Sequence, residues 1–154
     1  MKESWEKAIQ FVLKWEGGLS NDKDDPGGLT ICGICARSYP NDVQKMYELW
    51  KANKKEEAKK IAIDIYKKNY WDKSGCDNLP YPLDIIVFDT AVNMGVGTAQ
   101  GILKASQKDP LLYILLRIKR YRDIALANPK SAKFFLGWIN RVVDLFTFIK
   151  GAGK

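Results

Sequence analysis

Apolar residues recur along this 154-residue chain at the three- and four-residue spacing of one helix face, and glycine or proline ends most of these runs. In the first segment, Trp5, Ile9, Val12 and Leu13 follow this spacing. The glycine pair after residue 16 then offers the left-handed turn that ends a helix. The pattern predicts helices over residues 4–16, 41–51, 53–70, 83–94, 98 onward, 110–127 and 135–151.

Residues 19–34 interrupt this helical pattern. They are rich in glycine, aspartate, asparagine and proline, and they contain β-compatible pieces at 19–20 and 29–34. We expect a loop or a small hairpin there. The predicted fold is therefore mainly α, with one small β element after the first helix and an all-helical C-terminal part.

Two local signals indicate where predicted helices begin. Asn53 and Glu56 have the spacing of a capping box, which places the start of the third helix at residue 53. Asp109 followed by Pro110 is typical of a helix N-terminus, so the helix through residue 127 is expected to begin there.

Composition limits the chemistry that this chain can perform. A chain of 154 residues has the size of one compact domain, and a net charge of +7 favours anionic partners. Histidine is absent, which excludes serine and cysteine triads that need an imidazole base. Cys32, Cys35 and Cys76 are too few for a four-cysteine zinc site, and we interpret them as small, partly buried thiols. We expect no cofactor and no metal, so carboxylates remain as the catalytic groups.

The hydropathy of the chain argues against membrane insertion. Charged residues interrupt the first 20 positions, so no signal peptide is predicted and we expect synthesis in the cytoplasm. No apolar run reaches the roughly 18 residues of a membrane span.

Glu16 is the residue whose position most suggests catalysis. It continues the apolar stripe of the first helix and lies at the C-terminal end of that helix. Desolvation and the negative end of the helix dipole both favour the protonated carboxyl that a general acid needs. Glycosidases pair such an acid with a second, ionised carboxylate, for which Asp22, Asp24 and Asp25 are candidates.

Structural interpretations of the same residues stay open. Glu16 at the edge of the stripe could extend its carboxylate into water. The three aspartates could form Asx turns before the glycine pair at residues 27 and 28. The regular ligand alternation of a calcium loop is missing from this segment.

Further polar and aromatic residues are candidates for substrate binding. Asp89 and Asn93 project from an apolar helix face one turn apart, either as the floor of a sugar cleft or as a buried hydrogen-bonded network. Tyr66, Tyr70 and Trp71 either stack on sugar faces or belong to the core.

The sequence RIKRYRD at residues 117–123 is a basic cluster with an interleaved tyrosine. Such a cluster occurs in nucleic-acid-binding proteins and also on solvated helix faces. We interpret it as a solvated face and expect no nucleic-acid partner.

Three motifs, in order, resemble glycoside hydrolase family 108, the bacterial and phage N-acetylmuramidases. WEGGLSNDKDDPGGLTICGI at residues 15–34 is similar to the family signature around its catalytic glutamate. The segment 65–95, with FDTAVNMG, is similar to the family's tyrosine-tryptophan segment and the helix after it. The segment 120–142, with FFLGWINRV, resembles its C-terminal peptidoglycan-binding part.

The resemblance implies a lysozyme-like α+β fold and assigns roles to individual residues. Glu16 takes the place of the catalytic general acid. By similarity to phage lysozymes, Asp25 is the second carboxylate, with Asp22 as its rival, and Thr30 helps to hold the water. Leu19 stands in the substrate-binding segment where the family usually has tyrosine. The stretch between residues 101 and 121 is shorter than in the family.

The implied function is hydrolysis of the β-1,4 bond between N-acetylmuramic acid and N-acetylglucosamine in peptidoglycan glycan strands. A lytic transglycosylase and a non-catalytic wall-binding module are the alternatives. We expect a catalytic part at residues 1–97 and a peptidoglycan-binding-like part at 98–154, packed as one unit in a monomer. By resemblance to phage lysins, we expect delivery to the cell wall or periplasm by a separate holin-type pore protein or by another non-classical export route.

Overall fold

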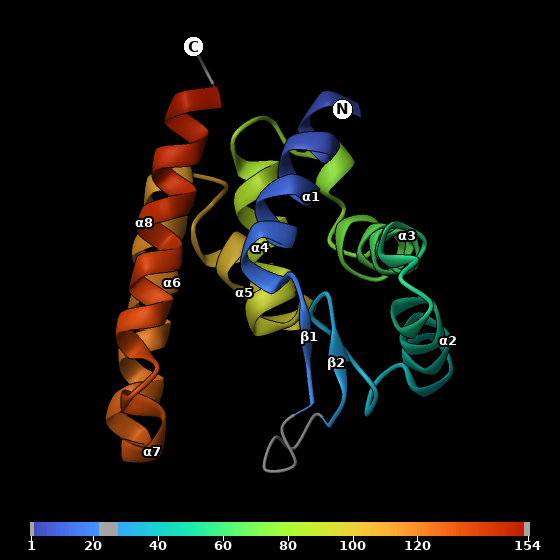
Figure 1. The fold of residues 1–154 in the computed structure, drawn as a ribbon. Coiled ribbons are helices and arrows are strands. Elements are labelled where there is room, and N and C mark those ends of the chain that lie inside the picture. Colours follow the sequence, from blue (N-terminus) through green and yellow to red (C-terminus); the bar gives the residue numbers. More distant parts are fainter. Residues whose placement is uncertain (1, 22–27, 153–154) are drawn as a thin grey trace. The chain divides into compact units, whose positions relative to one another are not determined.

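The computed structural model describes residues 2–21 and 28–152, and it confirms a mainly helical fold with one small β element (Figure 1). The elements in chain order are α1 (Lys2–Glu16), β1 (Leu19–Ser20), β2 (Thr30–Ile31), β3 (Ile34–Cys35), α2 (Pro40–Lys51), α3 (Lys55–Tyr66), the π-helical turn η1 (Lys67–Asp72), the 3-10 turn η2 (Cys76–Asn78), α4 (Leu83–Met94), α5 (Val96–Ala105), α6 (Pro110–Ala127), α7 (Pro129–Ala132) and α8 (Phe135–Ala152).

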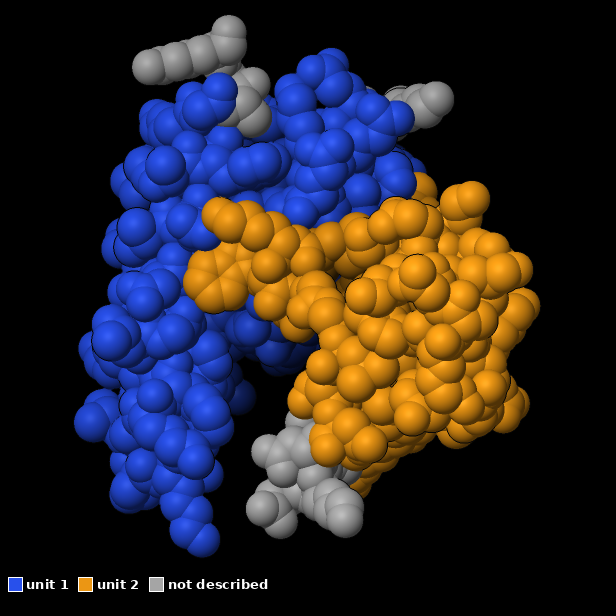
Figure 2. Space-filling view, in the orientation of Figure 1, with its two compact units in different colours: residues 1–11, 70–154 blue, residues 12–69 orange. Residues whose placement is uncertain are grey.

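The described residues form two compact units (Figure 2). The larger unit contains the described residues up to 11 and from 70 onward, and the smaller unit contains those between 12 and 69. Helix α1 contributes to both units. The boundary that we expected at residue 97 falls inside α5, within the larger unit.

The smaller unit contains a three-stranded antiparallel sheet in the order β1-β2-β3. Leu19 lies opposite Ile31 across the first pair of strands, and Ile31 lies opposite Ile34 across the second. Ile31 and Ile34 are fully buried, so the sheet supplies part of the core of this unit. Each strand has only two residues, and the predicted hairpin therefore occurs in a minimal form.

Asn53 ends α2 and does not cap α3, which corrects the predicted capping box. Its backbone is left-handed, with φ of 60°, and its N–H donates to the carbonyl of Trp50 at 3.1 Å. The N–H of Lys54 donates to the carbonyl of Leu49 at 2.8 Å. These two bonds form a Schellman motif, in which asparagine is the usual substitute for glycine. Helix α3 consequently begins two residues later than predicted, at Lys55.

Helix α3 also ends earlier than the predicted residue 70. The α-helical pattern stops at Tyr66, and the chain continues as the π-helical turn η1. A π-helical turn has i→i+5 hydrogen bonds and is wider than an α-helical turn. Side chains after residue 66 therefore leave the register that the apolar spacing of α3 predicts.

The larger unit is built around α4, whose residues 83–91 are all buried. An aromatic cluster packs against this helix, in which the rings of Trp5, Trp71 and Phe88 meet edge to face with centroids 5.4–5.5 Å apart. Gly95, with φ of 88°, ends α4 and allows α5 to start at once. Helix α5 therefore begins at Val96, two residues before the predicted start.

Helices α6 and α8 pack against each other in the larger unit (Figure 1). Val142, Leu145 and Ile149 form the buried side of α8, as their spacing predicts. The Tyr81 hydroxyl donates to the carbonyl oxygen of Ile149 at 2.6 Å and so attaches the end of α8 to the segment before α4. None of the helices within residues 2–21 and 28–152 combines the length and apolar character required to cross a membrane.

The Asp109 cap gives the first testable prediction. Its Oδ1 accepts a hydrogen bond from the backbone N–H of Leu112 at 2.6 Å, and Pro110 follows at the first helical position. Asp109→Ala should lower the free energy of unfolding by about 1 kcal/mol, because one N-terminal N–H of α6 loses its acceptor. Asp109→Asn, which caps equally well, should stay within about 0.5 kcal/mol of the wild type in urea unfolding. Equal losses in both variants would contradict the capping role.

Candidate active site

Glu16 is the last residue of α1 and is half-buried. The backbone after it leaves no room for a side chain at Gly17, where a β-carbon would lie only 2.7 Å from the carbonyl oxygen of Leu13. The carbonyl of Gly18 then accepts a hydrogen bond from the N–H of Cys32 at 2.8 Å. The segment that carries Glu16 is therefore attached at once to the small sheet.

The turn between β2 and β3 packs against the Glu16 side chain. Cys32 and Gly33 form this two-residue turn, with φ values of 50° and 78°. A β-carbon built on Gly33 would lie 2.6 Å from the β-carbon of Glu16 and would overlap the hydroxyl of Tyr66. The backbone at Gly33 thus occupies the space beside Glu16, and only glycine leaves room for both neighbouring side chains.

Tyr66 supports this turn from α3. Its hydroxyl donates to the carbonyl oxygen of Cys32 at 2.8 Å, and its side chain is only 1% exposed. Trp71 is completely buried, and its indole N–H donates to Asp77 Oδ1 at 2.8 Å. Neither ring has a free face on which a sugar could stack, so we leave Tyr66 and Trp71 out of the proposed substrate contacts.

Thr30 and Leu19 belong to the strands that follow Glu16. Thr30 is on β2, opposite Ser20, and its hydroxyl donates to the carbonyl of Gly28 at 3.3 Å. Leu19 is on β1 and is 38% exposed. Glu16 on α1, Leu19 on β1 and Thr30 on β2 thus all belong to the smaller unit. Asp22, Asp24 and Asp25, the candidates for the second carboxylate, lie outside the described residues.

Asp89 is the centre of a buried ionic cluster in the larger unit. Its Oδ1 accepts hydrogen bonds from Arg141 Nε and Nη2 at 3.0 and 2.8 Å, and Arg117 Nη1 lies 2.8 Å from its Oδ2. Burial opposes the charge of Asp89, but attraction by the two guanidinium groups outweighs it and lowers the pKa of Asp89. Asp89 is completely enclosed, which agrees with the structural interpretation of this residue and excludes a direct sugar contact in this conformation.

Asn93 and Trp138 extend this cluster through Tyr121. The Tyr121 hydroxyl accepts hydrogen bonds from Arg117 Nε and Nη2 at 3.1 and 3.0 Å and donates one to Asn93 Oδ1. Trp138 stacks on the Tyr121 ring with centroids 5.0 Å apart and an interplanar angle of 18°. Unlike Asp89, Asn93 is half-exposed and lines a cavity of about 160 Å³.

The basic cluster at residues 117–123 divides between core and surface. Arg117 and Tyr121 are buried, whereas Lys119 and Arg122 are exposed and pair with Asp123 at 2.8 and 3.0 Å. Sequence reasoning missed the role of Arg117. A signal was present, because Arg117 lies three residues after Ile114 and four before Tyr121 on one helix face, and a buried Asp89 requires a cationic partner.

The cysteines are free thiols. Burial raises the pKa of Cys32, which keeps its thiol protonated. Cys35 donates a weak hydrogen bond to the Ser38 hydroxyl at 3.4 Å. Across the part of the chain that the structure describes, no three histidine, cysteine, aspartate or glutamate side chains gather closely enough to hold a metal ion.

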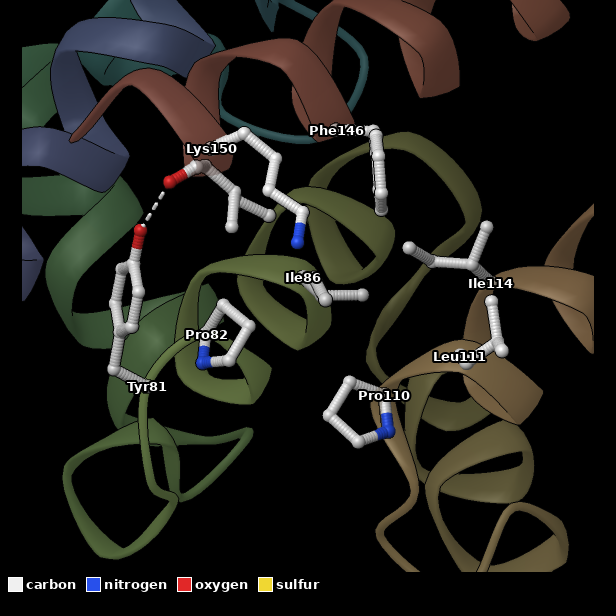
Figure 3. A pocket seen from close by; sticks show the side chains of 9 residues that line it. Tyr81, Pro82, Ile86, Pro110, Leu111, Ile114, Phe146 and Lys150 are labelled. Carbon is white, nitrogen blue, oxygen red and sulfur yellow. Dashed lines mark hydrogen bonds between the residues drawn. The ribbon is translucent and has the colours of Figure 1, made fainter. Parts of the chain in front are cut away.

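A cavity of about 520 Å³ lies in the larger unit between the starts of α4 and α6 and the end of α8 (Figure 3). Apolar side chains such as Ile86, Leu111 and Phe146 form its walls, and the Lys150 ammonium group points across it. None of its nine lining residues is acidic. This cavity therefore offers no carboxyl group that could serve as the acid of a glycosidase, and Glu16 remains the catalytic candidate.

Comparisons with known proteins gave a match to a family model and a match to a solved structure. The family model described as glycosyl hydrolase 108 matches residues 9–95, which is more than half of the chain and includes Glu16, Thr30 and Asp89. The solved structure of Brucella abortus SagA superposes with a TM-score of 0.73 and 24% sequence identity, over 98% of this chain and 96% of that one. At this identity the likeness shows a shared fold, the lysozyme-like α+β fold. No curated protein sequence gives a significant match.

Gly33 gives a second testable prediction. Gly33→Ala should lower the free energy of unfolding by about 2–4 kcal/mol, because a left-handed backbone and an overlap with Tyr66 and Glu16 act together. Gly28→Ala is the matched control, since φ at Gly28 is 65° but a β-carbon there would meet nothing within 4 Å. It should cost only about 1–2 kcal/mol in urea unfolding. A Gly33→Ala loss no larger than the control would show that the close packing is absent.

The pKa of Asp89 gives a prediction about pH. Because its folded-state pKa is lowered, its contribution to stability is complete above the unfolded pKa of about 3.9 and is lost as the pH falls through the folded pKa. Asp89→Asn should therefore cost about 3–5 kcal/mol at pH 7, where two buried arginines lose their counter-charge. The difference from the wild type should shrink in urea unfolding below about pH 4. A difference that is independent of pH would contradict a charged Asp89 in the native state.

Proposed function

This chain belongs to the glycosyl hydrolase 108 family, and from that membership we propose that it hydrolyses the glycan strands of peptidoglycan as an N-acetylmuramidase, with Glu16 as its general acid. The observation that carries the proposal is the placement of Glu16. It ends α1 within the segment that matches the family, and the Cys32-Gly33 turn packs against its side chain. A catalytic carboxyl needs such fixed surroundings, because proton transfer depends on the position of the acid relative to the leaving oxygen.

The proposed reaction begins with proton donation. Protonated Glu16 gives its proton to the glycosidic oxygen between N-acetylmuramic acid and N-acetylglucosamine while the bond from that oxygen to the sugar C1 breaks. Positive charge develops on the sugar ring, and an ionised carboxylate stabilises it or activates a water molecule. Water then adds its oxygen to C1 and returns a proton, which restores the carboxyl groups.

The other roles in this reaction are also proposals. Asp25, or Asp22 as its rival, would be the second carboxylate. Thr30 suits the holding of a water molecule, because its hydroxyl donates to the Gly28 carbonyl and keeps lone pairs with which to accept a hydrogen bond from water. Leu19 is exposed close to Glu16 in the sequence and would contact the sugar through its apolar surface. Asn93, on the larger unit, stays a predicted sugar contact.

The biological setting that we propose is wall lysis by a phage or prophage endolysin. The enzyme would act as a monomer on the cell wall after delivery through a holin-type pore or by another non-classical export route. Binding of the wall by residues 98–154 also stays a prediction, since the family match ends at residue 95.

The test is digestion of purified peptidoglycan by the wild type and by Glu16→Gln, with mass spectrometry of the released sugars. Glu16→Gln should lose about 10²- to 10⁴-fold in rate, the typical contribution of a general acid. Glu6→Gln is the matched control, because Glu6 is an exposed glutamate of the same helix, and it should keep full activity.

The released products distinguish the alternatives. Reducing muramic acid ends that only the wild type and the control produce would support a muramidase. Anhydromuramic ends would make the protein a lytic transglycosylase. Absence of product from all three proteins, with binding to peptidoglycan intact, would leave a wall-recognition module and reject the catalytic proposal.

A further inference from the structure

A second cavity, of about 350 Å³, lies in the smaller unit, the one that carries Glu16. Charges of both signs surround it. Asp42 and Lys45 come from the first turns of α2, and Asp64 and Lys68 come from the end of α3 and the start of η1. The amide of Asn69 completes the polar lining, and Ile61 and Ile65 supply an apolar part.

These four charges do not neutralise one another, although their spacing would allow it. Asp42 and Lys45 are three residues apart, and Asp64 and Lys68 are four apart. Elsewhere on the helices the same spacings give ion pairs, such as Lys59 with Glu56 at 2.7 Å and Lys119 with Asp123 at 2.8 Å. Within residues 2–21 and 28–152, no ion pair or side-chain hydrogen bond joins any two of the cavity's charges. All four therefore keep their hydrogen-bonding capacity for a ligand.

The π-helical turn η1 explains why Asp64 and Lys68 stay apart. In a continuous α-helix, an aspartate followed four residues later by a lysine is a favourable pair on one face. From Lys67 onward the turn is wider, so Lys68 is no longer in α-helical register with Asp64. Lys68 and Asn69 both belong to this turn, and π-helical turns are rare and occur frequently at functional sites.

The mixture of charges selects the chemical class of the ligand. A nucleic acid or another polyanion would be repelled by Asp42 and Asp64, and a metal ion would be repelled by Lys45 and Lys68. A neutral sugar gains little from four charges. A zwitterionic group matches them, because its ammonium and carboxylate can each meet an opposite charge while a short aliphatic part rests on Ile61 and Ile65.

On the premise, taken from the proposed function, that the substrate is peptidoglycan, we propose that this cavity binds the peptide stem of the glycan strand. Stem peptides carry free carboxylates, and a diamino acid in the stem adds an ammonium group. The cavity also shares a helix with the support of the catalytic residue. Ile65 lines the cavity, and the next residue, Tyr66, holds the Cys32-Gly33 turn beside Glu16. Stem binding would thus add substrate affinity on the same unit as the acid.

The first arm of the test measures binding without turnover. Full-length Glu16→Gln protein is titrated with the soluble tetrapeptide L-Ala-D-isoGlu-mesodiaminopimelate-D-Ala, and backbone amide shifts are followed by NMR. Saturable shifts should concentrate at residues 42–45 and 61–69. Adding Asp64→Asn and Lys68→Gln should weaken binding about tenfold or more, because two charge-assisted hydrogen bonds are lost. Adding Glu56→Gln and Lys59→Gln, an exposed pair on the same helix, is the control and should change nothing.

The second arm measures hydrolysis by the protein with Glu16 intact, on glycan strands that carry stems and on strands stripped of stems by an amidase. The Asp64→Asn, Lys68→Gln variant should lose about tenfold in kcat/KM on the former and nothing on the latter. Peptide shifts that are absent, or that the double substitution leaves unchanged, would overturn the stem site while muramidase activity could stand. Peptide binding at the cavity without hydrolysis of either strand would support the site and reject the proposed catalytic function.

Discussion

The larger unit depends on compensation for one buried carboxylate. Asp89 is enclosed on α4, and an isolated ionised carboxylate in such a place would cost several kcal/mol. Arg117 from α6 and Arg141 from α8 supply the opposite charges, at 2.8 Å each. The two ion pairs fix which faces of α6 and α8 are directed toward α4. The apolar packing of these helices must therefore be compatible with the same orientation. Tyr121 then hydrogen-bonds to Arg117 and to Asn93, and Trp138 stacks on its ring.

The smaller unit depends on a more local constraint, the absence of a side chain at Gly33. The backbone there approaches Glu16 and Tyr66 so closely that a β-carbon would collide with both. Helix α3 serves two purposes as a result. Its inward residue Tyr66 supports the turn beside the proposed acid, and its end, continued by η1, presents unpaired charges to a separate cavity. Substitutions on α3 can therefore test the positioning of Glu16 and the binding of substrate separately.

The local sequence predicted most helices to within two residues, because apolar periodicity and the glycine and proline signals act over a few neighbouring positions. The start of α6 was predicted correctly, since Asp109 and Pro110 have few alternative uses. The role of Asn53 was predicted wrongly, because asparagine is favourable both before a helix and in the left-handed position after one. Backbone hydrogen bonds to α2 place Asn53 in the second of these positions. The π-helical turn had no periodic signature, so the end of α3 was placed too late.

The sequence by itself determined the family, the mainly helical fold and the position of Glu16 at the end of an apolar stripe, because motif spacing and periodicity are properties of neighbouring residues. The sequence also left two interpretations of Asp89 open, the floor of a sugar cleft and a buried hydrogen-bonded network. Only the tertiary structure made that choice, since Arg117 and Arg141 come from helices distant in the sequence. The burial of Tyr66 and Trp71 likewise favours a core position for both rings. Sequence alone could not show this, because the exposure of a ring depends on what the remaining chain packs against it.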